Sequence, residues 1–257
     1  MRAAEITLPQ GRLEIAWWGP AAPDAPTIVL LHEGLGSLGL WRDFPEKLAQ
    51  ATGCGVFAYS RFGYGHSDPV PLPRPLDFMR IEACEVFPKL LDAIGIRRAI
   101  LFGHSDGASI AAIHACSHQD FRIHGLVLLA PHFFTEPVGL AATAQRYATG
   151  DLRPRLARHH AHVDIAFCGW ADTWLDRRFP KTLDLIPDIA HIRVPILATQ
   201  GEADSYGTVE QLTVLAREAY CPVRTLLLPG IDHAPRLEAP VAVLAASRHL
   251  TEKLWPT

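Results

Sequence analysis

Cysteines are few in this sequence, and none follows the regular spacings that bind metals or form disulfide frameworks. Five are scattered over 257 residues, and no pair has the CxxC pattern. The odd number and wide spacing exclude a disulfide framework and the usual zinc-ribbon sites. We therefore expect reduced thiols in a cytoplasmic protein, and the first seven residues agree, since they lack the apolar stretch of a signal peptide.

The chain also lacks an excess of charge of either sign and lacks a long hydrophobic run. Lysine and arginine total 24 against 27 aspartates and glutamates, for a net charge of −3 and a pI of about 6.5. This balance excludes a strongly basic nucleic-acid binder. No run of 18 apolar residues occurs, so we expect no transmembrane helix and no membrane partner. The hydrophobic share of 49% is typical of a globular chain with a sizeable core.

Short apolar segments of strand length recur along the chain, and most are separated by segments with a helical pattern. The strand-like segments lie at 6–8, 13–18, 27–31, 56–59, 98–103, 125–130, 194–200 and 223–228. The helix candidates lie at 41–51, 76–94, 108–117, 209–219 and 239–254. Strands that are apolar throughout are typical of a parallel sheet covered on both faces. The alternation predicts an α/β fold with a mostly parallel central sheet flanked by helices.

Residues 131–192 interrupt this alternation. The segment has no clear strand pattern, is mostly helical in pattern, and is rich in aromatic residues and histidine. Long insertions after a strand are more often functional than structureless. We therefore expect a helical cap, or lid, over a core formed by residues 1–130 and 193–257. Phe133, Trp170 and Trp174 are candidates for the wall of a substrate pocket.

A histidine cluster in the same insertion raises the question of a metal site. The residues concerned are His159, His160, His162 and Asp164. They have no cysteine partners and no HxxxH spacing, so a polar face of the lid explains them better than a metal site does. We expect neither a metal nor a cofactor.

The motif that indicates chemistry is Gly-His-Ser-Asp-Gly at residues 103–107, which fits GxSxG. It follows an apolar strand and opens a helical segment. That context is typical of a nucleophile elbow, a sharp strand-to-helix turn that lifts a serine hydroxyl clear of the sheet. Small residues are needed on both sides because the backbone is crowded there. The motif predicts Ser105 as a nucleophile.

The same four residues, Gly-His-Ser-Asp, occur a second time at 65–68. There the next residue is Pro69 instead of glycine, and a turn-rich segment precedes it instead of a strand. We therefore expect Ser67 to belong to a structural loop.

A serine hydroxyl needs a base at neutral pH, and the base needs an orienting acid. The expected order after such an elbow is acid and then histidine. Asp204 follows one strand-like segment and His233 follows the next, so both are expected at strand ends, where ligand sites open. Glu202 is the second candidate for the acid. Asp232 is disfavoured because it adjoins His233.

Stabilising a tetrahedral oxyanion requires preorganised N–H donors. The backbone N–H of Asp106, directly after the nucleophile, is one candidate. The other is expected in the loop at 32–37, after the strand-like segment at 27–31. Gly34 is the preferred donor and Leu35 the alternative, and Leu35 is also a candidate pocket residue.

Taken together, these segments resemble the α/β-hydrolase superfamily over nearly the whole chain. The matching segments are HEGLGS at 32–37, RFGYGHS at 61–67, GHSDG at 103–107, GEAD at 201–204 and DHAP at 232–235. The resemblance implies an α/β-hydrolase fold with a cap and no cofactor. It also implies a triad in which Ser105 is the nucleophile, Asp204 the acid and His233 the base.

Departures from the patterns of the superfamily narrow the activity. Haloalkane dehalogenases and epoxide hydrolases of this fold use aspartate where Ser105 stands, so both classes are excluded. Proline iminopeptidases resemble HGGPG in the first loop, whereas this chain has Glu33 at the second position. Carbon–carbon hydrolases often have tryptophan after the histidine, where this chain has Ala234. A hydrolase of small or medium carboxylic esters is therefore favoured. Carbon–carbon, lactone and thioester hydrolysis remain as alternatives, and the sequence indicates no oligomeric state.

Two other classes deserve consideration. Residues 34–39 match GxGxxG between a strand and a helix, and Arg61 could accept a 2′-phosphate, which would fit an NADP-dependent oxidoreductase. Two strand-like segments precede that strand, however, and no acidic residue closes the next one. A ligand-binding protein without turnover is the other class, but such proteins usually lack a triad member.

Asp106 is an unusual neighbour for a nucleophile that must generate an oxyanion. If its carboxylate is unpaired, it will disfavour anionic substrates and favour neutral or cationic ones. The alternative is a salt bridge to an arginine of the lid, such as Arg153 or Arg155.

Overall fold

A computed structural model describes residues 2–22 and 25–256. Residues 1, 23–24 and 257, which the expected core ranges include, lie outside the described residues. Within the described part of the chain, no helix is both long enough and apolar enough to cross a bilayer.

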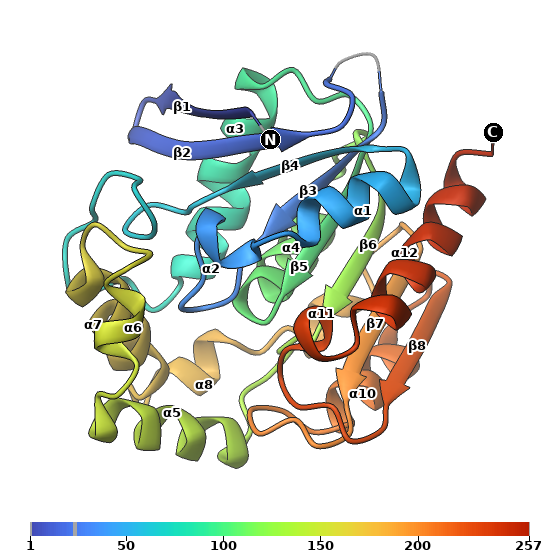
Figure 1. Ribbon diagram of the computed structural model, residues 1–257. Coiled ribbons are helices and arrows are strands. Elements are labelled where there is room, and N and C mark those ends of the chain that lie inside the picture. Colours follow the sequence, from blue (N-terminus) through green and yellow to red (C-terminus); the bar gives the residue numbers. More distant parts are fainter. Residues whose placement is uncertain (1, 23–24, 257) are drawn as a thin grey trace.

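One sheet of eight strands forms the centre of the described structure (Figure 1). In chain order the strands are β1 (Arg2–Leu8), β2 (Gly11–Trp18), β3 (Thr27–Leu31), β4 (Gly55–Tyr59), β5 (Ala99–His104), β6 (Ile123–Leu129), β7 (Ile196–Gly201) and β8 (Val223–Leu228). Their order across the sheet is β1-β2-β4-β3-β5-β6-β7-β8. The β1–β2 and β2–β4 pairs are antiparallel, and all other pairs are parallel. The predicted fold class is confirmed.

Helices cover both faces of this sheet. They are α1 (Phe44–Thr52), α2 (Phe78–Ile81), α3 (Phe87–Ala93), α4 (Asp106–Ser117), α10 (Glu210–Glu218), α11 (Pro235–Glu238) and α12 (Pro240–Leu254). Helices α1 and α12 contact each other and share one apolar core, whereas α3, α4 and α10 share the other.

Strand β3 shows why the strands are apolar throughout. Ile28 and Leu30 belong to the core under α1 and α12, whereas Val29 and Leu31 belong to the core under α3 and α4. Successive side chains of a strand point to opposite faces, so a strand covered on both sides needs apolar residues at every position.

Helices also fill the insertion at 131–192. They are α5 (Pro137–Thr149), α6 (Arg153–Leu156), α7 (Val163–Trp174), α8 (Phe179–Thr182) and α9 (Ile186–Ile189). Figure 1 shows α5 to α8 grouped beyond the carboxyl ends of the central strands, whereas α9 packs against α4 and α10. The two ends of the insertion meet where Phe134 forms an isolated β-bridge with Asp184.

The helix expected at 76–94 is not regular. Helix α2 ends at Ile81, a π-helical turn spans Glu82–Val86, and α3 begins at Phe87. Pro88 lies in the first turn of α3. Because proline has no backbone N–H, regular α-helical bonding cannot continue through this position, and the helix restarts there.

Candidate active site

Ser105 lies at the sharp turn between β5 and α4. Its backbone has φ 53° and ψ −119°, a conformation that is uncommon for a residue with a side chain. A Cβ atom at Gly103 would lie 2.3 Å from the carbonyl oxygen of Gly107, and one at Gly107 would lie 2.0 Å from that of Leu31. Both glycines are therefore required by the close approach of three backbone segments.

The three residues predicted as a triad meet at the carboxyl edge of the sheet. The Oγ atom of Ser105 lies 3.0 Å from Nε2 of His233. The Nδ1 atom of the same ring lies 2.9 Å from both oxygens of Asp204. A carboxylate only accepts hydrogen bonds, so Nδ1 carries the ring proton and Nε2 is left to accept from the serine hydroxyl.

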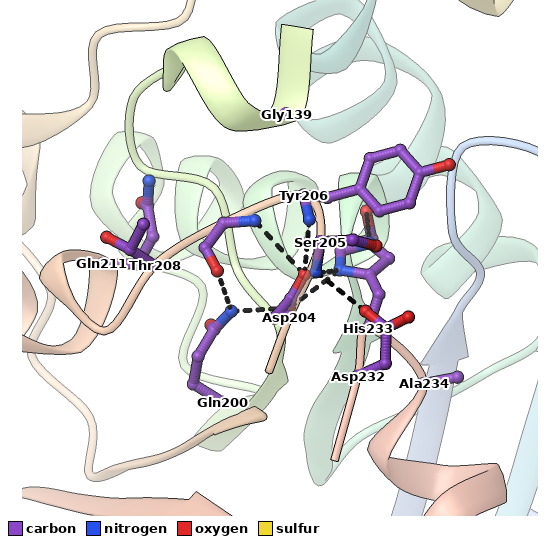
Figure 2. A network of polar contacts seen from close by, with 12 residues as sticks. Gly139, Gln200, Asp204, Ser205, Tyr206, Thr208, Gln211, Asp232, His233 and Ala234 are labelled. Carbon is purple, nitrogen blue, oxygen red and sulfur yellow. Dashed lines mark hydrogen bonds and ion pairs between the residues drawn. The ribbon is translucent and has the colours of Figure 1, made fainter. Parts of the chain in front are cut away.

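Asp204 is held by donors on every side (Figure 2). Its Oδ2 accepts from Nε2 of Gln200 at 2.6 Å, and its Oδ1 accepts from the backbone N–H of Tyr206 at 2.8 Å. Burial alone would raise the pKa of Asp204, but the hydrogen bond and charge of His233 and the Tyr206 N–H hold that pKa below its ordinary value. Glu202, the second candidate for the acid, is exposed.

The neighbouring carboxylate of Asp232 accepts a backbone hydrogen bond instead of contacting the His233 ring. Its Oδ1 accepts from the backbone N–H of Ser205 at 2.8 Å, as Figure 2 shows. The bond joins the loop that carries Asp204 to the loop that carries His233.

Three further rings surround the imidazole of His233. The ring centroids of His104, His132 and Tyr206 lie 5.4, 5.6 and 4.6 Å from it. The Nε2–H of His104 donates to the carbonyl oxygen of His233 at 2.7 Å and so anchors the backbone of that loop. The pKa of His132 is lowered to about 3, mainly by burial and secondly by the charge of the nearby His233, so this ring is neutral. The sequence carried no periodic or motif signal for these contacts.

A cavity of about 110 Å³ opens beside Ser105 and His233. The helices of the insertion contribute Gly139 and Thr143 from α5, and Trp170 and Trp174 from α7. Other lining residues are Glu33, Gly34, Leu35, Asp106, His132 and Tyr206. The structure thus brings Leu35, Trp170 and Trp174 to the cavity as predicted.

Phe133 does not line this cavity, and its predicted place is wrong. It is fully buried in the apolar core, and its backbone N–H donates to Oε1 of Gln211 at 2.8 Å. The preceding residue, His132, lines the cavity instead. The two neighbouring side chains are thus divided between the cavity and the apolar core.

The loop predicted to carry an oxyanion donor is held through its backbone carbonyl oxygens by Arg61 and His160. Two guanidinium nitrogens of Arg61 donate to the carbonyl oxygens of His32 (2.7 Å) and Glu33 (3.1 Å). A ring nitrogen of His160 lies 3.1 Å from the carbonyl oxygen of Leu35. Arg61 and His160 therefore shape this loop, and neither is free for a 2′-phosphate or a metal. Within residues 2–22 and 25–256, no three histidine, cysteine or acidic side chains are grouped to hold a metal ion.

The N–H groups proposed as oxyanion donors are available. Among the described residues, those of Gly34, Leu35 and Asp106 donate no hydrogen bond. A Cβ atom at Gly34 would lie 2.3 Å from Nε1 of Trp170, so only glycine allows the indole to pack so closely on this loop.

Ser67, in the second copy of the tetrapeptide, is structural. Its hydroxyl donates to the carbonyl oxygen of Ser60 at 2.6 Å and accepts from the backbone N–H of Glu14 at 2.9 Å. It is buried and does not line the cavity beside Ser105.

The carboxylate of Asp106 is buried without a hydrogen bond. In the described part of the chain, neither oxygen has a hydrogen-bond partner. The predicted alternative of a salt bridge to Arg153 or Arg155 is wrong, since Arg153 pairs with Asp164 and Arg155 forms no such pair among the described residues. Burial raises the pKa of Asp106 from 3.8 to about 6, although the charge of Arg61, the nearby indole N–H of Trp174 and the charge of His233 oppose the shift.

Replacing Asp106 with asparagine is expected to stabilise the fold at neutral pH. The folded carboxyl retains its proton up to about pH 6, whereas the unfolded one loses it near 3.8, so the stability of the natural protein falls as pH rises through that window. A shift of this size corresponds to roughly 3 kcal/mol. Urea unfolding at pH 4 and pH 7.5 should show a gain for Asp106→Asn at the higher pH alone. An equal difference at both pH values would contradict this account, and Glu202→Gln, an exposed carboxylate, is the control.

Comparison with known proteins identifies the family. A sequence profile for the alpha/beta hydrolase fold matches residues 26–188, which is more than half of the chain. The chain belongs to the alpha/beta hydrolase fold family. The resemblance predicted from the motifs is thus confirmed.

Curated relatives match this alpha/beta hydrolase over a limited region. A proline iminopeptidase from Lactobacillus helveticus is 29% identical over 105 residues, which is 41% of this chain and 35% of the relative. The 1-acylglycerol-3-phosphate O-acyltransferase ABHD5 from Homo sapiens is 30% identical over 115 residues, which is 44% of this chain and 32% of the relative. The match spans about a third of the length of either relative.

Solved structures are similar over almost the whole alpha/beta hydrolase chain. The enol-lactonase from Burkholderia xenovorans LB400 superposes with a TM-score of 0.73 at 22% identity, over 94% of this chain and 97% of that one. The carboxylesterase CesB (YbfK) from Bacillus subtilis gives a TM-score of 0.73 at 19% identity, over 100% of this chain and 92% of that one. At these identities the likeness concerns the fold.

Proposed function

We propose that this alpha/beta hydrolase is a serine hydrolase that cleaves small or medium carboxylic esters through an acyl-enzyme. The observation that carries the proposal is the chain of contacts from Ser105 Oγ to His233 Nε2 (3.0 Å) and from His233 Nδ1 to Asp204 (2.9 Å). A hydroxyl, a base and an orienting acid in that geometry form an activated nucleophile.

In the first half of the reaction, Ser105 Oγ attacks the ester carbonyl carbon while its proton passes to Nε2 of His233. The tetrahedral oxyanion then collapses. Its bond to the alcohol oxygen breaks, and the imidazolium of His233 returns the proton to the leaving alcohol. In the second half, His233 takes a proton from water and the resulting hydroxide attacks the acyl carbon. The bond from that carbon to Ser105 Oγ then breaks, and the imidazolium of His233 returns the proton to Oγ, which releases the acid and restores Ser105.

Asp204 holds the His233 ring in the tautomer that the first step needs, and its negative charge stabilises the imidazolium formed in both halves. The backbone N–H groups of Asp106 and of Gly34 or Leu35 are the proposed oxyanion donors. Their support is that they lie on the cavity wall and donate no other hydrogen bond among the described residues.

The size and walls of the cavity favour a small acyl group or alcohol. A volume of about 110 Å³ fits a few heavy atoms, and the wall is formed in large part by Leu35, Trp170, Trp174 and Tyr206. We further propose that residues 131–192 act as a cap. Side chains from α5 and α7 line the cavity, so movement of these helices would govern entry to it.

A fluorophosphonate probe tests the proposed nucleophile directly. Wild-type protein is expected to gain the mass of one phosphonyl group on the peptide that contains Ser105, whereas Ser105→Ala gains none. Assays with p-nitrophenyl esters, lactones, thioesters and dienoic diketones then rank the bond types. Labelling on another residue, or esterase activity that survives Ser105→Ala, would overturn the proposal.

A further inference from the structure

Two carboxylates, Asp106 and Glu33, lie on the wall of the cavity beside Ser105. Asp106 is fully buried, and both of its oxygens lack a hydrogen-bond partner among the described residues. Glu33 accepts through Oε1 from Arg236 at 3.0 Å, and its Oε2 lies 3.4 Å from Nδ1 of His104. Burial would raise the pKa of Glu33, yet Arg236 and then His104 hold it well below its usual range, so this carboxylate is charged.

The arginines whose positive charges act on Asp106 form no hydrogen bond with it and donate elsewhere. Arg61 donates to the carbonyl oxygens of the 32–33 segment, and Arg74 donates to the carbonyl oxygen of Phe62 and lies over the ring of Tyr64. Neither arginine lines the cavity. Among the cavity-lining residues, charge of either sign is therefore limited to two carboxylates and the histidines.

Aromatic side chains complete the same wall. Trp170 and Trp174 from α7 line the cavity together with Asp106. The Oδ2 atom of Asp106 lies 3.1 Å from the position that a Gly34 Cβ would occupy, and Trp170 packs on that same position. The atoms of Trp170 nearest that position are Nε1 and Cδ1, and no lysine or arginine is among the residues that line the cavity.

We propose that Asp106 selects for esters that carry an ammonium group close to the cleaved carbonyl. This inference rests on the proposed function, because it names the substrate class of that site. A charge buried beside a small cavity acts through a medium from which water is largely excluded, so it attracts a cation and repels an anion more strongly than a surface carboxylate would. Above about pH 6 the Asp106 carboxyl is ionised and can act in this way.

The reaction itself gives a reason for a cation at this place. The oxyanion forms within reach of the Asp106 backbone N–H, so a negative Asp106 side chain opposes it. A substrate ammonium offsets the repulsion between the Asp106 carboxylate and the oxyanion in the transition state. A neutral ester has no charge that could offset it. The preference should therefore appear in kcat as well as in KM.

The test uses pairs of esters of nearly equal shape that differ in charge, assayed at pH 7.0. Glycine ethyl ester and ethyl propionate place the ammonium or its methyl counterpart on the acyl side. Acetylcholine and 3,3-dimethylbutyl acetate place it on the alcohol side. For one of the two pairs, wild-type kcat/KM is expected to favour the cationic ester at least about 10-fold. Asp106→Asn should reduce that preference to less than about 3-fold, and the exposed control Glu202→Gln should keep it.

A binding measurement separates this inference from the proposed function. Calorimetric titration with n-propylammonium is expected to show binding to wild type and to Ser105→Ala, and a loss of at least about 10-fold in affinity in Asp106→Asn. Asp106→Ala replaces the asparagine variant if the latter does not fold. Equal affinities in all variants, or a wild-type preference for the neutral ester in both pairs, overturn the inference even if ester hydrolysis by Ser105 is established. If no ester is hydrolysed, the titration alone decides.

Discussion

Replacing Ser105 with alanine will lower kcat for ester hydrolysis by about 10⁵- to 10⁶-fold, because no other hydroxyl on the cavity wall reaches His233 within hydrogen-bond distance among the described residues. The loss should fall mainly on kcat, since the cavity wall that binds the substrate is unchanged. Steady-state rates with a p-nitrophenyl ester, combined with circular dichroism to verify folding, measure it.

The same chain supplies a matched control in Ser67, which stands in the second Gly-His-Ser-Asp segment. Ser67→Ala removes one buried and one partly buried hydrogen bond and should cost roughly 1–3 kcal/mol of stability while leaving kcat unchanged.

His233→Ala should be nearly as damaging as Ser105→Ala. The double variant should be no worse than either, because a nucleophile and its base act as a unit. Additive losses would show that the two residues do not work together.

The sheet and the elbow could be predicted because their signals are local. A strand covered on both faces must be apolar at each position, so β3, β4 and β5 are visible as short continuous runs. The elbow needs glycine at position 107 because the backbone of Leu31 lies too close for a side chain there. This requirement is visible in the sequence as the last glycine of the GxSxG motif. The parallel topology then placed the acid and the histidine at the ends of strands β7 and β8, and the elbow motif gave their order along the chain.

The surroundings of the site could not be predicted, since they depend on which distant segments meet. His104 lies inside the recognised motif, but its bond to the carbonyl of His233 spans more than a hundred residues. His132 lines the cavity whereas Phe133 enters the apolar core, and no periodicity in the irregular segment after β6 distinguishes these two positions. The unpaired state of Asp106 likewise depends on the side chains that pack around it, and no pattern in its neighbours along the chain reveals this.

Asp204→Asn is expected to lower kcat by about 10⁴-fold even though the substitution is nearly isosteric. Every group that faces this carboxylate is a donor. Tyr206 and Gly207 supply backbone N–H groups to Oδ1, and Gln200 donates to Oδ2. The amide nitrogen of asparagine must therefore take the Oδ2 position, where it faces Nδ1 of His233 as a second donor. Nδ1 can then only accept, so the ring proton moves to Nε2.

With its proton on Nε2, the His233 ring can no longer take the proton of Ser105, and catalysis is lost while the fold is kept. Glu202→Gln, which removes a carboxylate at the end of the same strand but on an exposed side chain, should change kcat less than about 3-fold. NMR of the imidazole nitrogens can verify the change of tautomer independently of the rate. A normal rate in Asp204→Asn, or a loss of rate in Glu202→Gln of similar size, would mean that Asp204 does not orient the base. The hydrogen bonds from Gln200 and Tyr206 would then serve only to order the loop.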